Sequence, residues 1–275
     1  HEYEPEYEVK PAATRKRVVV IGGGPAGLEA AKVAGERGHS VTLLERRDRL
    51  GGQLCHASKE VGGGHIWLKL IRYYETELAR FGVDVRLGEE VTREVCERLK
   101  PDVVIVATGA TLDGEGRYPA DGRALLSVYD VLEDRAEVGE RVVVLSGERA
   151  GLVCAEHLAA QGKRVTIVES GERVAADVIP TFRWRHLAWL REYGIEVVTR
   201  AHVEAITPDG VALADGERRV IPADSVIVAG PRRSVQELAG LLEFSGDEIY
   251  VVGDAVRPRS AHNAVRDGFL IGVRI

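Results

Sequence analysis

The feature that most constrains the fold is a pattern that occurs twice in the 275 residues, at a fixed separation. Residues 17–33 read RVVVIGGGPAGLEAAKV, and residues 141–157 read RVVVLSGERAGLVCAEH. Each copy is an apolar strand pattern, a loop with glycines and a helix pattern. Gly151 follows Gly27 by 124 positions, and Glu169 follows Glu45 by the same 124. A constant offset across the whole pattern indicates an internal duplication.

Each copy predicts one strand, helix, strand unit. The first has a strand over 18–21, a helix over 26–37 ended by Gly38, and a strand over 41–44. The second has the corresponding segments at 141–145, 152–161 and 165–168. Strands that alternate with helices favour parallel sheets with crossover helices. We therefore predict an α/β fold with two Rossmann-like dinucleotide-binding domains.

Later segments indicate how the two domains share the chain. DVVIVATGA (102–110) and DSVIVAGPRR (224–233) are similar strands, each leading into a glycine, and EIYVVGDAVRP (248–258) adds another strand. Residues 111–123 are rich in turn formers, as a connection between domains should be. We predict a linker over 1–14, a discontinuous FAD-binding domain over 15–112 and 224–275, and an NAD(P)-binding-like domain over 113–223, inserted in the first.

The loop after the first strand carries Gly22, Gly24 and Gly27 in a GxGxxG arrangement. The first glycine allows a tight turn, the second lets a diphosphate approach the backbone, and the third lets helix and strand pack closely. The positive end of the helix dipole favours the same anion. Glu45, at the end of the next strand, can accept hydrogen bonds from ribose hydroxyls. Together these residues predict a dinucleotide site in the first domain.

The second loop has Ser146, Glu148 and Gly151 at the three equivalent positions. Glu148 places a bulky anion where the diphosphate would lie, which opposes binding by steric exclusion and by charge repulsion. We predict that this domain keeps the nucleotide-binding fold but binds NAD(P)H weakly, in another pose or not at all. If it does bind, Glu169 favours NADH over NADPH, because it would repel the extra phosphate.

Composition excludes several classes of function. The net charge of -6 disfavours non-specific binding to nucleic acid or to an anionic membrane. No apolar run approaches the ~18 residues of a membrane span. The three cysteines, Cys55, Cys96 and Cys154, include no CxxC pair and no metal-type cluster, which favours a reducing, cytoplasmic setting and small buried thiols. We expect no metal site and no dithiol redox centre in this chain.

No nucleophile and base pair stands out, so we predict no catalytic side chain. His56 and His65 flank a glycine-rich stretch, where a surface or satisfied core role is favoured over catalysis. The chain has no Met, and its last residues, AVRDGFLIGVRI, stop within an amphipathic helical pattern. We expect a processed product or a piece of a longer chain.

Four motifs, GGGPAGLEAA, LLERRDRLGGQL, VIVATGA and YVVGDA, together resemble flavoproteins with two dinucleotide-binding domains. The chain is most similar to the C-terminal half of the 2,4-dienoyl-coenzyme A reductase and trimethylamine dehydrogenase family, which is related to old yellow enzyme. The resemblance extends from about Lys16 to the end.

The resemblance implies a role in electron transfer. Such enzymes carry an N-terminal TIM barrel with FMN and a [4Fe-4S] cluster, followed by FAD-binding and NAD(P)-binding domains. The opening HEYEPEYEVKPAATRKR resembles the linker that follows the barrel. The chain would thus be an FAD-binding oxidoreductase module that exchanges electrons with such a barrel, as a partner subunit or a missing domain. An enoyl thioester or an N-methylated amine would be the substrate, bound by the barrel, and the direction of electron flow stays open.

The resemblance also assigns the cofactor contacts. They are Gly22, Gly24, Ala26 and Gly27 for the FAD diphosphate, Glu45 and Arg46 for the adenosine ribose region, Gly52 and Gln53 for the flavin side, Thr108 and Gly109 along the cofactor, and Gly253 with Asp254 for the ribityl chain.

The altered second loop keeps an alternative open. It favours the amine dehydrogenase or N-demethylase branch, in which electrons leave for an electron-transfer flavoprotein and the FAD-like site can hold ADP. The alternative hypothesis is a non-redox docking module that binds ADP and has a degenerate NAD(P) site. GGQL and GDA favour FAD, NADH remains a possible second cofactor, and we expect an oligomer.

Overall fold

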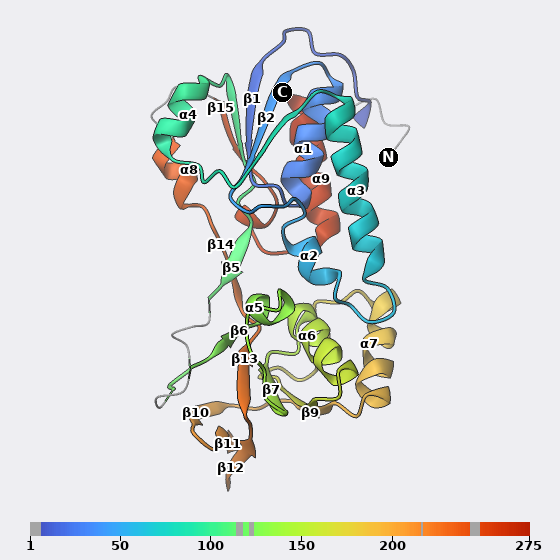
Figure 1. Ribbon diagram of the computed structural model, residues 1–275, viewed down its shortest axis with the longest axis vertical. Helices are drawn as coiled ribbons and strands as arrows, with labels where there is room; N and C mark the ends of the chain where they lie inside the picture. Colours follow the sequence, from blue (N-terminus) through green and yellow to red (C-terminus); the bar gives the residue numbers. More distant parts are fainter. Residues whose placement is uncertain (1–6, 114–117, 121–123, 216, 243–247) are drawn as a thin grey trace. The chain divides into compact units, whose positions relative to one another are not determined.

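The computed structural model describes residues 7–113, 118–120, 124–215, 217–242 and 248–275. The chain divides into two compact units (Figure 1). The first unit contains residues 1–55, 66–111 and 233–275, and the second contains residues 56–65 and 112–232. Residues 8–16 form no helix or strand.

The first unit is a parallel five-stranded sheet in the order β15-β4-β1-β2-β3. The strands are β1 (Arg17–Ile21), β2 (Ser40–Glu45), β3 (Asp84–Leu87), β4 (Val103–Val106) and β15 (Glu248–Val251). The helices are α1 (Pro25–Glu36), α2 (Gln53–Ala57), α3 (His65–Arg80), α4 (Arg93–Leu99), α8 (Glu237–Leu242) and α9 (Ala261–Arg274), with a 3-10 turn, η2 (Gly253–Ala255). Helices α1, α3 and α9 cover one face of the sheet, and α4 and α8 cover the other (Figure 1). Covering of both faces explains the unbroken apolar runs of β1 and β4.

The second unit repeats this arrangement. Its parallel sheet has the order β6-β13-β7-β8-β9, with β7 in the place of β1 and β13 in the place of β4. The strands are β6 (Leu126–Ser127), β7 (Arg141–Leu145), β8 (Arg164–Val168), β9 (Glu196–Val198) and β13 (Ser225–Val228). The helices are α5 (Val128–Leu132), α6 (Arg149–Ala160) and α7 (Pro180–Glu192), and an antiparallel sheet of β10 (Val203–Thr207), β11 (Gly210–Asp215) and β12 (Glu217–Pro222) follows β9. The α/β prediction with parallel sheets is confirmed.

The duplication extends to individual hydrogen bonds. In the first unit the backbone N–H of Arg17 donates to Asp102 at 2.7 Å, and its guanidinium binds the same carboxylate at 2.8 Å. In the second unit Arg141 makes the same two contacts with Asp224, at 2.8 and 2.6 Å. Each pair joins the first residue of the central strand to the residue at the start of its neighbour. The similar segments 102–110 and 224–233 therefore hold equivalent places in the two sheets.

The compact units differ from the predicted domain boundaries. Residues 224–232 were expected in the first domain, but β13 pairs with β7 and completes the second sheet. Residues 56–65 run from the end of α2 to the first residue of α3, yet they pack in the second unit. Part of the predicted connection, residues 114–117 and 121–123, lies outside the described residues. The chain passes between the units along β5 (Ala110–Leu112) and β14 (Arg232–Ser234), which pair as a two-stranded sheet.

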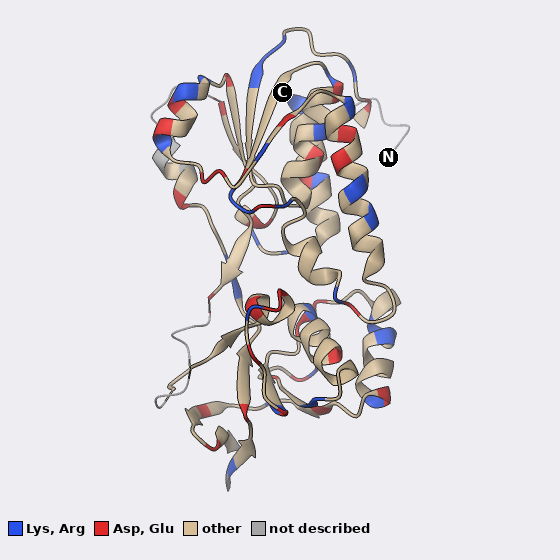
Figure 2. Ribbon diagram, in the orientation of Figure 1, with Lys and Arg blue, Asp and Glu red and all other residues tan. Residues whose placement is uncertain are grey.

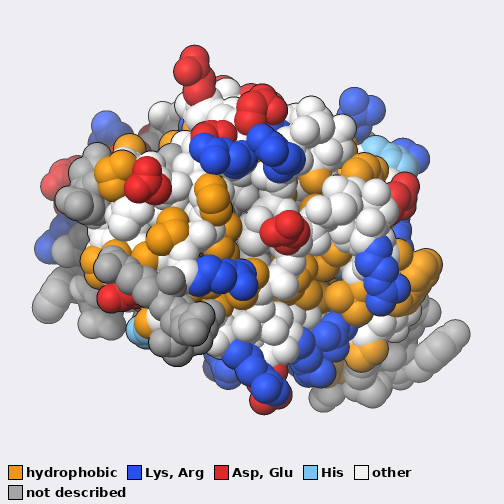
Figure 3. Space-filling model, turned by 90° about the horizontal axis from the view of Figure 1, so that it is seen from below, with side chains coloured by type: hydrophobic (Ala, Val, Ile, Leu, Met, Phe, Trp, Pro, Cys, Tyr) orange, Lys and Arg blue, Asp and Glu red, His pale blue; other side chains and the backbone are white. Residues whose placement is uncertain are grey.

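Charges of both signs are distributed over the elements of each unit. Helices α3 and α4 each carry basic and acidic side chains (Figure 2). On the face drawn in Figure 3, basic, acidic and hydrophobic side chains of the described residues are interspersed. None of the described helices is both long enough and apolar enough to span a membrane.

Candidate functional site

The first candidate site lies at the carboxyl ends of β1 and β4, where the sheet order changes direction. Nucleotides bind at this edge in open parallel sheets. A Cβ atom added at Gly22 would lie 2.4 Å from the carbonyl oxygen of Ala107, and one added at Gly253 would lie 2.6 Å from the Cβ of Ala26. The structure therefore brings together the predicted residues that follow β1, β4 and β15. We call this place the first crevice.

Different structural constraints apply to the three glycines of the first loop. Gly22 has a φ of +108°, which disfavours a side chain. A Cβ added at Gly27 would lie 1.9 Å from the carbonyl oxygen of Gly22, so helix and strand pack too closely for one. Gly24 has an ordinary φ of -80° and ψ of 178°, and an added Cβ would meet nothing within 4 Å. Packing and conformation therefore do not require glycine at position 24.

The open space beside Gly24 lies at the N-terminus of α1. Gly24 is the N-cap residue, and no side chain caps the helix there. The first N–H groups of a helix lack partners within the helix and carry its positive dipole end. A Cβ added at Gly109, after β4, would also meet nothing within 4 Å. The crevice is thus open where the FAD diphosphate is predicted, and the residues present fit that group.

Glu45 is buried and holds the loop itself. Its Oε2 accepts from the N–H of Gly23 at 2.6 Å, and its Oε1 accepts from the N–H of Arg47 at 2.8 Å. Each carboxylate oxygen can accept a further hydrogen bond. The predicted contact with ribose is therefore compatible with this structural role, which the sequence prediction missed. Arg46 is exposed beside it.

The predicted flavin-side residues follow β2. The N–H of Gly51 donates to the carbonyl oxygen of Gly23 at 2.8 Å, which ties this segment to the first loop. A Cβ added at Gly52 would lie 2.9 Å from the Cα of Gly24. Gln53 begins α2. Gly52 therefore lies against the open space beside Gly24.

Sequence reasoning missed the residues that tie the far side of the crevice together. Thr108 donates through Oγ1 to the carbonyl oxygen of Val235 at 2.6 Å, and the N–H of Val235 donates to Gly109 at 3.0 Å. Ser234 donates through Oγ to the carbonyl oxygen of Asp254 at 2.8 Å. The segment that re-enters the first unit thus fixes both predicted cofactor loops. No local motif marks it.

Asp254 lies in the turn η2, directly after β15. Its Oδ1 accepts from the N–H of Arg259 at 2.8 Å, and the Arg259 side chain forms an ion pair with Asp267. The Asp254 carboxylate is half-buried at the same edge of the sheet. His262 is exposed near the start of α9.

The second loop keeps the backbone of the first. Ser146 has a φ of +126°, close to that of Gly22, and a Cβ added at Gly151 would lie 2.1 Å from the carbonyl oxygen of Ser146. Glu169 accepts from the N–H of Gly147 at 2.6 Å and from the N–H of Gly171 at 2.7 Å. These contacts match those of Glu45. The place at the carboxyl ends of β7 and β13 is the second crevice.

The second crevice contains side chains where the first is open. Glu148 has a φ of -70° and a ψ of 169°, so its backbone matches that of Gly24. Its Oε2 would lie 3.5 Å from a Cβ added at Gly230, across the crevice. Both carboxylate oxygens of Asp177 accept from the N–H of Arg149, the first residue of α6, at 3.0 and 3.1 Å. Burial, with a further contribution from Asp177, raises the pKa of Glu148.

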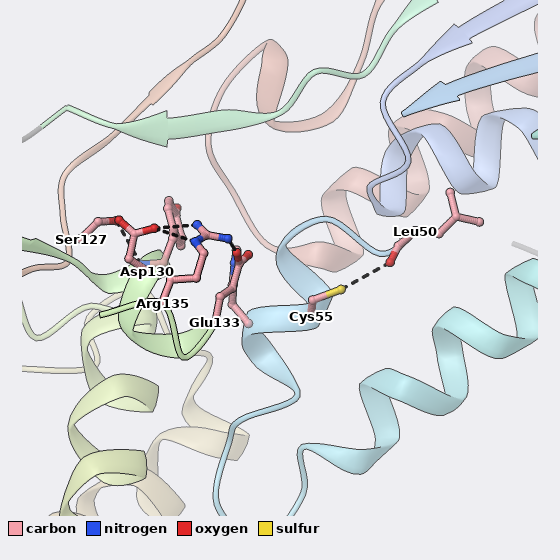
Figure 4. Close-up of polar contacts among 8 residues, drawn as sticks. Leu50, Cys55, Ser127, Asp130, Glu133 and Arg135 are labelled. Atoms are coloured by element: carbon pink, nitrogen blue, oxygen red, sulfur yellow. Dashed lines mark hydrogen bonds and ion pairs between the residues drawn. The ribbon is translucent and has the colours of Figure 1, made fainter. Parts of the chain in front are cut away.

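The cysteines do not form a redox pair. None of the three is in a disulfide, and Cys55 Sγ donates to the carbonyl oxygen of Leu50 at 3.4 Å (Figure 4). Burial raises the pKa of Cys55 and raises that of Cys154 to about 12. Among the residues that the structure describes, no group of three His, Cys, Asp or Glu side chains has a metal-binding arrangement.

His56 has a structural environment, as the favoured interpretation expected. It is buried, its ring stacks on Tyr129, and its Nε2 lies 2.6 Å from Glu133. Arg135 forms ion pairs with Glu133 and Asp130 on the same unit (Figure 4). His65 is exposed.

Comparison with known proteins identifies the family. The model of the pyridine nucleotide-disulphide oxidoreductase family matches residues 16–268. NADH oxidase of Thermoanaerobacter brockii is 37% identical over 98% of this chain, which corresponds to 42% of that protein. The solved structure of a 2-naphthoyl-CoA reductase in complex with 2-naphthoyl-CoA is 32% identical, with a TM-score of 0.95 over 100% of this chain and 42% of that one. The chain thus spans less than half the length of these relatives.

Histamine dehydrogenase from Rhizobium sp. 4-9 shares the fold, with a TM-score of 0.85 at 24% identity over 96% of this chain and 44% of that one. These similarities confirm the predicted resemblance to the C-terminal half of the dienoyl reductase and amine dehydrogenase group. They support a flavin oxidoreductase module and do not favour the alternative of a non-redox docking module. The chain belongs to the pyridine nucleotide-disulphide oxidoreductase family.

Proposed function

We propose that the first unit binds FAD and that the chain is the electron-transfer half of a larger flavin and iron-sulfur enzyme. The observation that carries this proposal is the open space at Gly24. Gly22 and Gly27 are explained by conformation and packing, whereas Gly24 is not. A glycine without a structural reason, at the positive end of α1, is explained by a diphosphate that approaches the backbone.

The other residues receive roles from their places in the crevice. Gly24, Ala26 and Gly27 hold the diphosphate at the start of α1. Glu45 accepts from the adenosine ribose, and the exposed Arg46 lies at that end. Gly52 and Gln53 lie on the flavin side, Thr108 and Gly109 line the cofactor, and Asp254, positioned by Gly253, accepts from the ribityl hydroxyls.

When bound, FAD supplies the chemistry of hydride and single-electron transfer, and the protein supplies binding, orientation and electrostatics. The segment Ser234–Val235 holds the loops after β4 and β15 in place through hydrogen bonds to Thr108 and Asp254. We propose no acid, base or nucleophile from this chain.

The relatives support a proposal for the partner and the substrate. We propose that an FMN and [4Fe-4S] TIM barrel, as another domain or subunit, exchanges electrons with this FAD, because the relatives are more than twice as long as the matched region. The barrel would bind the substrate. The 2-naphthoyl-CoA reductase supports a thioester, and the N,N-dimethylglycine/sarcosine dehydrogenase of Chromohalobacter salexigens, 38% identical over 64% of this chain and 27% of that protein, supports an N-methylated amine. An electron-transfer flavoprotein would accept electrons in the second case. Three cysteines outside any disulfide fit a reducing cytoplasm.

Flavin content tests the proposal. In Gly24→Val the added methyl groups enter the open space, so the fold should persist while the FAD content after purification falls at least about tenfold. Glu148→Val, at the equivalent position of the second loop, should keep the FAD content of the wild type. A Gly24→Val protein with full flavin content would show that the diphosphate lies elsewhere.

A further inference from the structure

A carboxylate of the chain itself, that of Asp177, already binds the N-terminus of α6. Asp177 lies in the loop between β8 and α7, and both of its carboxylate oxygens accept from the N–H of Arg149. In the first unit the equivalent residue is Pro25, which has no N–H to donate. The donor that α6 offers at its first position is therefore satisfied within the protein.

The side chain of Arg149 is also paired internally. Its guanidinium donates to Glu60 at 3.2 Å, and Glu60 is almost buried. The other Glu60 oxygen lies 4.0 Å from His186 Nε2, and His186 Nδ1 lies 2.7 Å from Glu156. A cation that could attract a phosphate at the start of α6 is thus held by a carboxylate from the segment 56–65.

Glu148 fills the remaining space. It is half-buried, and its Oε2 lies beside Gly230 at the end of β13, on the opposite side of the crevice. A dinucleotide in the usual pose crosses the sheet at this point. Glu148 and Asp177 would then face its two phosphate charges, and although Arg232 near Glu148 opposes them, juxtaposed like charges weaken binding.

We infer that Glu148 and Asp177 are specificity-determining residues of the second crevice, where their carboxylates take the place of a dinucleotide's diphosphate. Nicotinamide dinucleotides therefore bind this crevice weakly in the usual pose. The inference concerns the second unit and does not depend on whether the first unit binds FAD.

Titration calorimetry with ADP-ribose tests the inference, because this probe carries the diphosphate but no redox-active ring. Every protein titrated also carries Gly24→Val, whose added methyl groups enter the open space of the first crevice, so the design does not rely on FAD binding there. On this background the second unit is wild type, Glu148→Gly, Asp177→Asn or the double variant. Glu192→Gln, which removes an exposed charge on α7 of the same unit, is the matched control.

The double variant should bind ADP-ribose at least about tenfold more tightly than wild type, and each single variant should fall between them. The control should stay within about twofold of wild type. Equal affinities in wild type and the double variant would overturn the inference. If the double variant does not fold, Glu148→Gly alone decides: it should bind at least about threefold more tightly, and an unchanged affinity would overturn the inference. Flavin content, measured separately, reports only on the first crevice.

Discussion

The two crevices share almost every feature of their backbone and differ in what occupies them. Both have a loop with positive φ at its first position, a third glycine that packs on the loop, and a glutamate that binds two N–H groups. Gly24 leaves the first crevice open, whereas Glu148 and Asp177 fill the second. Gly24, which we propose admits a ligand, thus differs from the residues that maintain the fold.

A second comparison concerns the helices that follow these loops. Each buries a glutamate: Glu29 in α1 and Glu156 in α6. Glu29 accepts from the hydroxyl of Tyr74 at 2.9 Å and from Lys32 at 3.2 Å, and Glu156 lies 2.7 Å from His186. Burial raises the pKa of Glu156, and His186 opposes this rise. The two units thus neutralise a buried carboxylate with different partners.

Exchanging the residues at which the two loops differ, Gly24 and Glu148, should have the largest effect, which is on FAD content. Gly24→Glu gives the first crevice the side chain of the second. The backbone at position 24 already matches that at 148, so the protein should fold, but FAD content should fall more than about tenfold because of the added charge and bulk. The measurement is the flavin to protein ratio after purification. Glu148→Gly, the reverse exchange, should leave this ratio unchanged, and a fall in both variants would refute the distinction between the crevices.

Removing the partner of the buried glutamate in the second unit should cost the most stability. In His186→Ala, Glu156 stays buried without its counterpart, which should lower the free energy of unfolding by about 3 kcal/mol or more. Urea denaturation followed by circular dichroism measures it. His65→Ala, at an exposed histidine, should change it by less than about 0.5 kcal/mol. If both variants lowered the free energy of unfolding by the same small amount, the His186–Glu156 pair would contribute little to stability.

The corresponding change in the first unit should be smaller, because Glu29 has two partners. Tyr74→Phe removes only the hydroxyl, and Lys32 remains beside the carboxylate. We expect a loss of about 1–2 kcal/mol. Glu75→Gln, at the next position and exposed on α3, is the control and should be nearly neutral. If Tyr74→Phe lowered the free energy of unfolding more than His186→Ala does, the expected order of the two effects would be wrong.

The smallest effect should come from removing the charge of Glu148 at the second crevice, and it should be on the melting temperature. The folded state raises the pKa of Glu148 above its ordinary value of 4.5, so ionisation opposes folding as the pH rises through the folded pKa. Glu148→Gln should therefore raise the melting temperature at pH 7 by roughly 1–3 °C. The difference should vanish below the unfolded pKa, where wild-type Glu148 is protonated in both states. Melting curves across this pH range would contradict the assignment if the gain were the same at every pH.

Much of the fold was predictable because local patterns determine it. The apolar runs of β1 and β7, the packing glycines Gly27 and Gly151, and the glutamate that ends β2 are all visible in sequence. The segment 224–233 was recognised as similar to 102–110, but it was assigned to the wrong side of the domain boundary. Its strand, β13, is the counterpart of β4 and so completes the second sheet.

What sequence could not predict depends on contacts between distant residues. His56 binds Glu133 across 77 positions, and Thr108 binds Val235 across 127. Nothing local in HASKEVGGGH indicates that residues 56–65 pack in the second unit. Asp177 likewise follows no motif, although Glu148 was identified as an obstacle. Only the structure shows that a second carboxylate satisfies the start of α6.

The central claim is that the first crevice holds FAD, and identification of the nucleotide tests it most directly. The purified chain is denatured, and the released nucleotide is identified and quantified by chromatography with absorption detection. We expect one FAD per folded chain in wild type and Glu148→Gly, and almost none in Gly24→Glu. A colourless wild-type protein that releases ADP, or a Gly24→Glu protein that retains its FAD, would contradict it.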